Sequence, residues 1–217
     1  TTGDGAKKQG ATECSACIPG QFQNLTAQAT CKMCGKHMYA SVKQAHHCVA
    51  CPAGYSADEQ GSDQCQRCGA GTHGANSDGC KDCEPGFYRS NEDINLDAAA
   101  QCKLCPQGYY TSDSQQQFCL ACDVGTFSND IGSIICAVCP AGFSQPAKRQ
   151  SLCEECALGT IAASVGASVC NACPIGKYQL NTTRCFHCLL GKVSSERATK
   201  TCRACGSGQI PNEKRTN

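Results

Sequence analysis

Twelve Cys-x-x-Cys pairs run through this chain, and their spacing constrains its fold more than any other feature does. All 24 cysteines of the 217-residue sequence belong to one of these pairs. The pairs begin at Cys14, Cys31, Cys48, Cys65, Cys80, Cys102, Cys119, Cys136, Cys153, Cys170, Cys185 and Cys202. Eight of the eleven steps between them are 17 residues long, and the others are 15, 22 and 15. Such a period predicts stacked repeats, each too small to fold alone.

The composition leaves too few apolar side chains for an ordinary hydrophobic core. Leu, Ile, Val and Phe together account for 30 of the 217 residues, and there is no Trp, whereas chains with less than about 20% of these residues tend not to collapse. Cysteine at this density is typical of secreted domains in which disulfides replace a core. The formal net charge of +1 offers no field to attract nucleic acid, so we expect no nucleic-acid partner.

A glycine recurs with the same period as the cysteines. It lies three residues after the second cysteine of eleven pairs, and only the second pair has another residue there, His37. In most units an aromatic or branched residue follows it, as Tyr55 and Phe143 do. Because glycine permits a positive φ, the pattern predicts a tight turn and then a short strand whose large side chain covers a disulfide. The intervening segments are polar and lack a helical period, so we expect little helix.

The residues that follow the pairs carry a resemblance to a known family. The sequence reads C-P-A-G-Y-S at 51–56, C-P-Q-G-Y-Y at 105–110, C-P-A-G-F-S at 139–144 and C-P-I-G-K-Y at 173–178. This pattern resembles the ephrin-receptor-like cysteine-rich repeat, which is similar to tumour-necrosis-factor-receptor and epidermal-growth-factor modules. The resemblance implies an elongated rod or solenoid of about twelve short, disulfide-rich, β-hairpin-like units with no large hydrophobic core. It implies no ligand, because such repeats occur in receptors, surface antigens and fibres alike.

The repeats divide the chain into three parts. We expect a polar N-terminal segment at 1–13, twelve repeats of about 17 residues over 14–205 with a long loop at 84–101, and a polar C-terminal segment at 206–217. No apolar run reaches the roughly 18 residues of a membrane span, so we expect no membrane segment in this chain. The sequence starts without Met or a signal-peptide pattern, as a mature product or an excerpt of a longer protein does.

Two disulfide schemes fit the spacing, and sequence alone does not choose between them. In a uniform ladder, which also matches the bond in the receptor loops that the repeats resemble, the second cysteine of each pair bonds to the first of the next. That ladder pairs Cys17 with Cys31, Cys34 with Cys48, Cys51 with Cys65, Cys68 with Cys80, Cys83 with Cys102, Cys105 with Cys119, Cys122 with Cys136, Cys139 with Cys153, Cys156 with Cys170, Cys173 with Cys185 and Cys188 with Cys202. It leaves Cys14 and Cys205 for an external or intermolecular disulfide.

In the rival scheme the pairs are grouped in twos with crossed bonds. Cys14 then bonds to Cys31 and Cys17 to Cys34, and no cysteine stays free. Steps inside a module should then be constant while steps between modules vary. Both 15-residue steps do fall between modules, but the 22-residue step falls inside one. Disulfides within one Cys-x-x-Cys pair are strained and suit redox enzymes, so twelve of them are not expected.

Metal binding is a further use of such pairs. Cys-x-x-Cys motifs also form zinc sites, but zinc modules have distinct linkers, whereas these gaps are nearly uniform, so we expect no metal and no cofactor. In the long loop, Asp93, Asn95 and Asp97 place oxygens at alternate positions as a calcium loop does. Because Ala98 and Leu104 replace the Gly and Glu of an EF-hand, a solvated insertion is the favoured interpretation and a weak calcium site the alternative.

Two sequons agree with an extracellular location. They are Asn24-Leu25-Thr26 and Asn181-Thr182-Thr183, both in polar loops, and we expect N-linked glycans at Asn24 and Asn181.

No motif of catalysis is present, neither a nucleophile elbow nor a phosphate-binding glycine loop, so we expect no enzyme and no catalytic residue. The sequence therefore predicts a secreted, structural glycoprotein: a subunit of a fibre or surface coat, or a rigid spacer stalk, which assembles with itself or with other extracellular proteins. Ile134, Ile135, Leu189 and Leu190 are candidates for that packing unless they cover their own disulfides. The alternative is the ligand-binding ectodomain of a cell-surface receptor or adhesin, with the long loop as its contact site.

Overall fold

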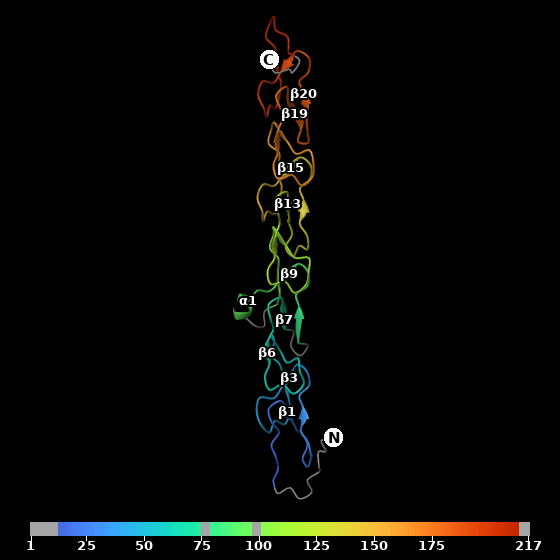
Figure 1. The fold of residues 1–217 in the computed structure, drawn as a ribbon, viewed down its shortest axis with the longest axis vertical. Helices are drawn as coiled ribbons and strands as arrows, with labels where there is room; N and C mark the ends of the chain where they lie inside the picture. Colours follow the sequence, from blue (N-terminus) through green and yellow to red (C-terminus); the bar gives the residue numbers. More distant parts are fainter. Residues whose placement is uncertain (1–12, 75–78, 97–100, 213–217) are drawn as a thin grey trace, which may run out of the picture. The chain divides into compact units, whose positions relative to one another are not determined.

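A computed structural model describes residues 13–74, 79–96 and 101–212 of the chain, without the side chains of residues 95 and 96. Residues 1–12 of the N-terminal segment expected at 1–13, residues 213–217 of the C-terminal segment expected at 206–217, and Asp97 therefore lie outside the described residues. The chain forms two compact units. The first comprises residues 1–84, 88–103 and 114–117, and the second comprises 85–87, 104–113 and 118–217. Within each unit the hairpins follow one another in chain order (Figure 1).

Short antiparallel hairpins make up nearly all of the described structure, as the repeat pattern predicts. In the described residues there are eleven two-stranded sheets, each pairing one strand with the next. The strands are β1 (Gln21–Phe22), β2 (Lys32–Met33), β3 (Met38–Tyr39), β4 (Val49–Ala50), β5 (Tyr55–Ser56), β6 (Gln66–Arg67), β7 (Thr72–Gly74), β8 (Cys80–Asp82), β9 (Phe87–Tyr88), β10 (Lys103–Leu104), β11 (Tyr109–Tyr110), β12 (Leu120–Ala121), β13 (Thr126–Phe127), β14 (Ala137–Val138), β15 (Phe143–Ser144), β16 (Glu154–Glu155), β17 (Thr160–Ile161), β18 (Asn171–Ala172), β19 (Lys177–Asn181), β20 (Arg184–His187), β21 (Lys192–Val193) and β22 (Arg203–Ala204).

Each hairpin is closed by one disulfide, and the pairing is that of the uniform ladder. The second cysteine of one pair, here the opening cysteine, bonds to the first cysteine of the next pair, the closing cysteine. We number the hairpins 1 to 11 by their opening cysteines: Cys17, Cys34, Cys51, Cys68, Cys83, Cys105, Cys122, Cys139, Cys156, Cys173 and Cys188. The crossed scheme is not found among the described residues, where Cys14 and Cys205 have no disulfide partner.

The turn before each first strand follows the glycine pattern. The glycine three residues after the opening cysteine, here the turn glycine, has a φ between 74° and 90° at every described position from Gly20 to Gly208. In hairpin 2, His37 takes the same left-handed conformation at φ 63°. A residue with a Cβ adopts the left-handed conformation at a cost of roughly 1–2 kcal/mol. The recurrence of glycine at this position is therefore explained by the geometry of the turn.

The buried positions differ from those expected. All eleven opening cysteines are buried, but the large residues of the first strands, such as Phe22 and Tyr55, are only half buried. Ile134, Ile135, Leu189 and Leu190, which could have covered their own disulfides, are between 55% and 86% exposed. The core of each hairpin is thus the disulfide itself and the backbone around it.

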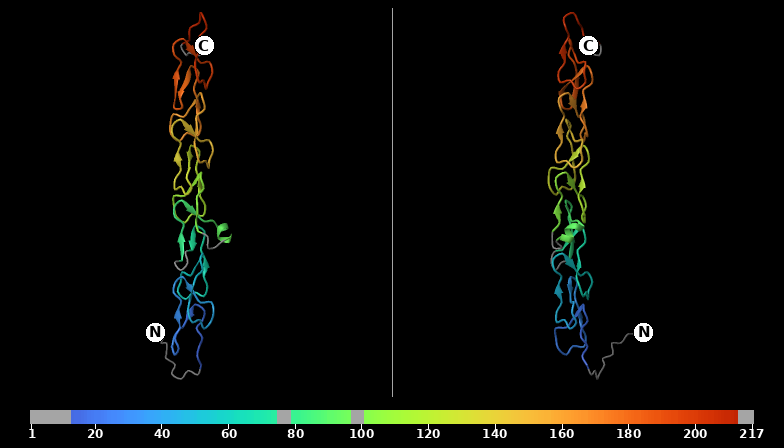
Figure 2. Two further views of the ribbon diagram at one scale, coloured as in Figure 1. Left: turned by 180° about the vertical axis from the view of Figure 1, so that it is seen from behind. Right: turned by 90° about the vertical axis from the view of Figure 1, so that its left-hand side faces the viewer.

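Hairpin 5 corrects the expectation of a solvated loop at 84–101. It contains α1 (Asn91–Leu96), the one helix of the described residues, which stands to the side of the hairpins of the first unit (Figure 2). Asp93 and Ile94 in this helix are buried. The described part of the insertion is therefore a short helix with a buried side and not a solvated loop, although the expectation of little helix overall is confirmed.

Two turn and loop glycines in the second unit provide a matched test of the fold. A Cβ at Gly159 would collide with the backbone of Ala198, whereas a Cβ at Gly166 would meet nothing within 4 Å, and both residues have a positive φ. We expect Gly166→Ala to cost about 1 kcal/mol of unfolding free energy, from φ alone, and Gly159→Ala about 2–4 kcal/mol, because the backbone must also shift. Denaturant unfolding of the oxidised chain measures both values, and equal losses would contradict the close approach at Gly159.

Candidate functional site: the joint between repeats

Consecutive hairpins are joined by main-chain hydrogen bonds that recur along the chain. We call the residue six positions after each opening cysteine the central residue. The amide of a turn glycine donates a hydrogen bond to the carbonyl of the central residue in the next hairpin, and two further main-chain bonds link the loops of the two hairpins. Between hairpins 6 and 7 the three bonds are Gly108 N to Ser128 O (2.9 Å), Thr111 N to Ser133 O (3.1 Å) and Gly132 N to Cys105 O (2.7 Å). The same set recurs between hairpins 7 and 8, as Gly125 N to Gln145 O, Ser128 N to Gln150 O and Arg149 N to Cys122 O. Because the joint uses backbone atoms, it tolerates changes of side chain.

The turn glycines also touch the hairpin after next. A Cβ at Gly20 would collide with Gly61 of hairpin 3, and one at Gly125 would collide with Gly166 of hairpin 9. We call the residue ten positions after each opening cysteine the loop residue, and in both examples it is the partner of the turn glycine. The loop residue has a positive φ in every hairpin whose disulfide joins cysteines 14 positions apart. Where this contact is made, a hairpin is therefore held by two successors, and bending at its joint strains both contacts.

The central residue is the functional position that sequence reasoning missed. Its carbonyl accepts from the hairpin before and its amide donates to the hairpin after, as Ser128 shows in the second unit. Consequently it is buried in ten of the eleven hairpins, although its side chain is small or polar. The eleven central residues are Gln23, Ala40, Ala57, Gly74, Arg89, Thr111, Ser128, Gln145, Ala162, Gln179 and Ser194. The one sign of it in the sequence was that the residue six positions after each opening cysteine is never a large apolar residue.

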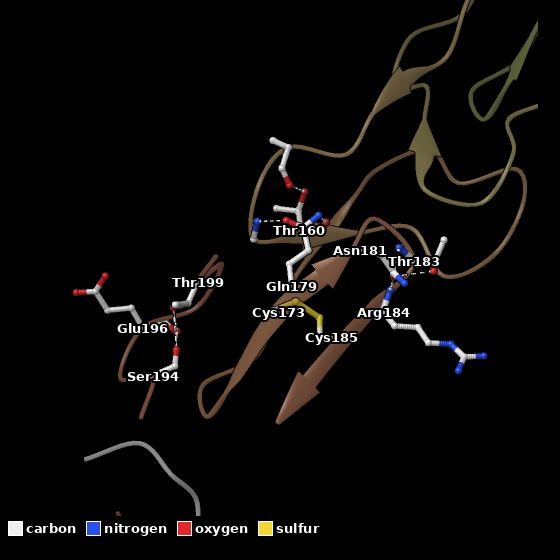
Figure 3. The surroundings of a disulfide bond; sticks show 12 residues. Thr160, Cys173, Gln179, Asn181, Thr183, Arg184, Cys185, Ser194, Glu196 and Thr199 are labelled. Atoms are coloured by element: carbon white, nitrogen blue, oxygen red, sulfur yellow. Dashed lines mark hydrogen bonds between the residues drawn. A yellow bond between two sulfur atoms is a disulfide. The ribbon is translucent and has the colours of Figure 1, made fainter. Parts of the chain in front are cut away.

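Polar side chains at the central position satisfy the loop that surrounds them. Ser194 Oγ lies 2.9 Å from Glu196 O and 2.8 Å from Thr199 Oγ1 (Figure 3). Ser128 makes the equivalent contacts in hairpin 7, at 3.2 Å to Asp130 O and 2.6 Å to Ser133 Oγ. Buried polar groups are costly unless they are paired, and these pairings explain why a core made of serine is stable.

Hairpin 10 shows how a shorter repeat keeps the joint. Its disulfide, Cys173–Cys185, spans 12 residues instead of 14, and its strands β19 and β20 meet through an irregular register near Gln179. The carboxamide of Gln179 then replaces a main-chain carbonyl: Gly159 N donates to Gln179 Oε1 at 2.5 Å, and Gln179 Nε2 donates to Thr160 O at 2.8 Å (Figure 3).

In hairpin 2, His37 occupies the position of the turn glycine. Its ring lies where a Cβ on Gly79 of hairpin 4 would be, and its Nδ1 is 2.9 Å from Ser56 Oγ, which donates to Asp58 Oδ1 at 2.6 Å. Hairpin 4 is also a 12-residue hairpin, and its Gly79 has no Cβ that would collide with the imidazole. This exception to the glycine pattern is therefore a local replacement of a backbone contact by a side chain.

The insertion in hairpin 5 is fixed by polar contacts at both ends. Ser90 Oγ accepts from Asp93 N at 3.2 Å and Asp93 Oδ2 accepts from Ser90 N at 3.2 Å, a reciprocal cap that starts α1. Lys103 donates to the other oxygen of Asp93. The fully buried Arg89 donates to Thr72 O at 2.7 Å in hairpin 4.

These contacts shift the pKa values of Asp93 and Lys103 in opposite directions. The hydrogen bond from Lys103 holds the pKa of Asp93 below its ordinary value of 3.8, burial opposes that effect, and the bonds from Ser90 add to it. The same hydrogen bond raises the pKa of Lys103. Because both oxygens of Asp93 already have partners and Asp97 lies outside the described residues, calcium binding stays a prediction.

The two sequons lie on exposed loop residues. Asn24 is exposed in the loop of hairpin 1, and Asn181 is exposed at the end of β19. Asn181 Oδ1 accepts from Thr183 Oγ1 at 2.9 Å and from Arg184 N at 2.9 Å (Figure 3), which leaves its amide nitrogen directed away from the turn's hydrogen bonds. Glycosylation at either site stays a prediction.

Neither a metal-binding cluster nor a membrane-spanning helix is found in the described residues. Within residues 13–74, 79–96 and 101–212, no three His, Cys, Asp or Glu side chains come together as a metal site would require. In the same ranges no helix is long and apolar enough to cross a membrane.

Comparison with known proteins shows similarity to a family of cysteine-rich repeats and to a curated human protein. The family described as tyrosine-protein kinase ephrin type A/B receptor-like matches at three overlapping positions, residues 94–135, 111–149 and 125–173. A stretch of 96 residues is 35% identical to human proprotein convertase subtilisin/kexin type 6. That match covers 42% of this chain and only 9% of the relative, so it concerns a small part of the convertase.

Replacing Asp93 tests the structure of the insertion. A carboxylate whose folded pKa is lowered stabilises the fold above its ordinary pKa and loses this effect as the pH falls through the folded pKa. We expect amide exchange at Ser90 and Ile94 to accelerate severalfold between pH 5 and pH 2 relative to the intrinsic rate, and Asp93→Asn to abolish this acid dependence. Asp123→Asn is the control, since Asp123 pairs with Lys148 at 2.8 Å on the exposed surface, where ion pairs contribute little. An acid response that Asp93→Asn leaves unchanged would contradict the pairing.

Proposed function

Because the chain is built of tandem ephrin-receptor-like cysteine-rich repeats, we propose that it is a structural extracellular element. Repeats of this family are non-catalytic modules of the extracellular type. The finer role proposed here is mechanical: a subunit of a glycosylated fibre or surface coat, or a stiff spacer stalk. The observation that carries the proposal is the joint, in which three main-chain hydrogen bonds and one contact to the hairpin after next recur within each unit.

Stiffness follows from the density of connections at each joint. A hairpin cannot tilt without lengthening hydrogen bonds to its neighbour and separating its turn glycine from the second neighbour. A main-chain hydrogen bond contributes about 0.5–1.5 kcal/mol net, so three bonds at one joint oppose bending by several times RT. The exposed side chains do not contribute to this resistance to bending, so the surface is free to be glycosylated or to bind partner proteins.

The disulfides limit extension when the joints fail. In a hairpin such as that of Cys139 and Cys153, the bridge holds two Cα atoms 5.7 Å apart although they are 14 positions apart in the sequence. A stretched repeat can then lengthen only over the three residue steps from the first to the second cysteine of a pair, to about 16 Å. A reduced repeat of 17 residues could extend to about 58 Å. The ladder thus converts a long polar chain into a tether of limited length.

Single-molecule pulling from residue 14 to residue 205 tests the mechanical role. For the oxidised chain we expect a stiff response and then a maximum extension of roughly 180 Å, and after reduction roughly 650 Å, from about 3.4 Å per extended residue. Gly159→Ala, whose Cβ would collide with the backbone of Ala198, should soften the first response without changing the maximum. An oxidised chain that lengthens at low force as a random coil does would rule out a load-bearing role.

The insertion of hairpin 5 favours a second candidate, a ligand-binding ectodomain. The capped helix α1 is the one helix of the described residues, and Glu92 is exposed on it. If this role holds, oxidised protein should bind an extracellular ligand in a saturable manner, and shortening hairpin 5 to the length of its neighbours should abolish the binding. A shortened chain that still forms fibres or coats would favour the structural role.

A further inference from the structure

Hairpins 7 and 9, both in the second unit, expose large aliphatic side chains at two matching positions. The residues two and nine positions after the opening cysteine are Val124 and Ile131 in hairpin 7, and Leu158 and Val165 in hairpin 9. All four are between 41% and 65% exposed. None of the other nine hairpins has a large aliphatic residue at both positions. Hairpin 3 has Gln60 at the second position, so the loop itself does not require an apolar residue there.

A contact between hairpins 7 and 9 joins two of these residues. A Cβ on Gly125 would lie 2.2 Å from the carbonyl oxygen of Gly166, so the two glycines are in direct contact. Val124 precedes the first of these glycines and Val165 precedes the second. The two exposed valines, which belong to different hairpins, therefore flank the same contact.

Two further contacts of the same kind extend this surface on either side. The side chain of Leu104, which is 43% exposed, lies where a Cβ on Gly132 would be, and Gly132 follows Ile131. Gly159, which follows Leu158, contacts the loop of hairpin 11. We call the five aliphatic residues along this line of contacts the apolar face: Leu104, Ile131, Val124, Val165 and Leu158.

The apolar face is large enough to hold a partner. A Leu, Ile or Val side chain at these exposures presents on the order of 100 Å² of surface, so the five together present roughly 500 Å². Apolar patches of this size are at the upper end for proteins that act as monomers, and they are often functional. Two such faces in contact would bury about 1,000 Å², the size at which specific interfaces begin. Both sequons, at Asn24 and Asn181, lie in other hairpins, so neither glycan would be attached to the face.

Charge changes sign along the hairpins that form the apolar face. Hairpin 7, residues 122–138, has two acidic residues, Asp123 and Asp130, and no basic residue. Hairpin 9, residues 156–172, has no charged residue at all. Hairpin 11, residues 188–204, has four basic residues and one acidic residue. The apolar face therefore has an acidic end, an uncharged middle and a basic end.

One exposed charged residue marks each end of the face. Asp130 precedes Ile131 at the acidic end, and Arg197 precedes Ala198, the residue that Gly159 contacts, at the basic end. A second copy that runs antiparallel to the first places the acidic end of each face against the basic end of the other. The uncharged middle then lies against itself. A parallel copy would instead bring like charges together, so the face is complementary to itself in the antiparallel orientation.

We propose that two copies of this chain pair side by side and antiparallel through the apolar face, about a two-fold axis beside Val124 and Val165. Ile131 of each copy then packs against Leu158 of the other, and Asp130 faces Arg197 at both ends, because a two-fold interface repeats every contact. The occupant is a second copy because both its charge pattern and its apolar area complement the face. This inference rests on the proposed structural function and specifies how copies would be bound laterally in a fibre or coat.

The association state of the full, oxidised chain is the first test. The reference chain carries Cys14→Ser and Cys205→Ser, so that no disulfide can link two copies. Analytical ultracentrifugation should then show a reversible dimer and give its dissociation constant. A reference chain that stays monomeric up to about 0.1 mM would overturn the proposal. So would a monomer that instead binds vesicles of phosphatidylcholine and phosphatidylserine, because the face would then belong to a membrane surface.

Two double variants of the reference chain test the face itself. Ile131→Gln with Val165→Gln removes two side chains of the face, and Phe118→Gln with Leu152→Gln removes two equally exposed apolar side chains from hairpins 6 and 8. We expect the first variant to weaken dimerisation about hundredfold, because four apolar side chains are lost from each dimer. The second should change the dissociation constant less than about threefold. Equal losses would contradict the face, since they would show unspecific apolar association.

Charge reversal tests the antiparallel orientation. Asp130→Arg alone and Arg197→Asp alone should each weaken dimerisation about tenfold at low salt, because like charges then meet at both ends of the face. The chain that carries both substitutions should return to within about threefold of the reference, because opposite charges meet again. Asp130 is the residue chosen because Asp123 is paired with Lys148. Single reversals that leave the dissociation constant unchanged would overturn the antiparallel pairing.

Imaging of single copies separates failure of this inference from failure of the proposed function. The Ile131→Gln, Val165→Gln variant provides such single copies for electron microscopy. Stiff single particles, together with a reference chain that never dimerises, would refute the lateral pairing and leave the role as a spacer intact. Flexible single particles would instead refute the mechanical function, whether or not the reference chain dimerises.

Discussion

Main-chain hydrogen bonds between successive hairpins are the interaction on which the rest of this structure depends. A single hairpin has strands of two residues in most repeats and one disulfide, too little to be stable alone. Three backbone bonds to the next hairpin and a backbone contact to the one after give each repeat its fixed position. The disulfides act in support, because closing a loop of about 15 residues lowers the entropy of the unfolded chain by the equivalent of about 3 kcal/mol.

This dependence on backbone atoms explains the composition. Residues are constrained only where the joint needs a particular backbone or a small volume: the cysteines, the turn glycine and the central residue. A buried Ala, Ser or Thr at the central position suffices because the neighbouring hairpins already fill the space around it. The loops and strand faces stay free to be polar, which is why so few Leu, Ile, Val and Phe are needed. Where the backbone pattern is broken, a side chain such as Gln179 or His37 replaces the missing contact.

The repeat, the hairpins and the positions of the turns could be predicted because each follows from a local rule: cysteine spacing, or the φ that only glycine adopts freely. The burial of Ser128 and Arg89 could not, since it arises from hydrogen bonds to other hairpins and leaves no apolar residue in the sequence. The contact between Gly125 and Gly166 was missed for the same reason, because it links hairpins that are not adjacent. The helix α1 was missed since its cap, Ser90 with Asp93, lies in a short polar segment that also resembles a calcium loop.

The partner of Cys139 tests the ladder most directly. Cleavage of the oxidised, denatured chain at Lys103, Lys148, Arg149 and Lys177 separates residues 104–148 from residues 150–177 unless a disulfide joins them. The ladder predicts that the two peptides stay linked through Cys139 and Cys153 and separate on reduction. If Cys139 is bonded to Cys122 instead, as in crossed modules, the peptides separate without reduction, and the account of independently closed hairpins is wrong.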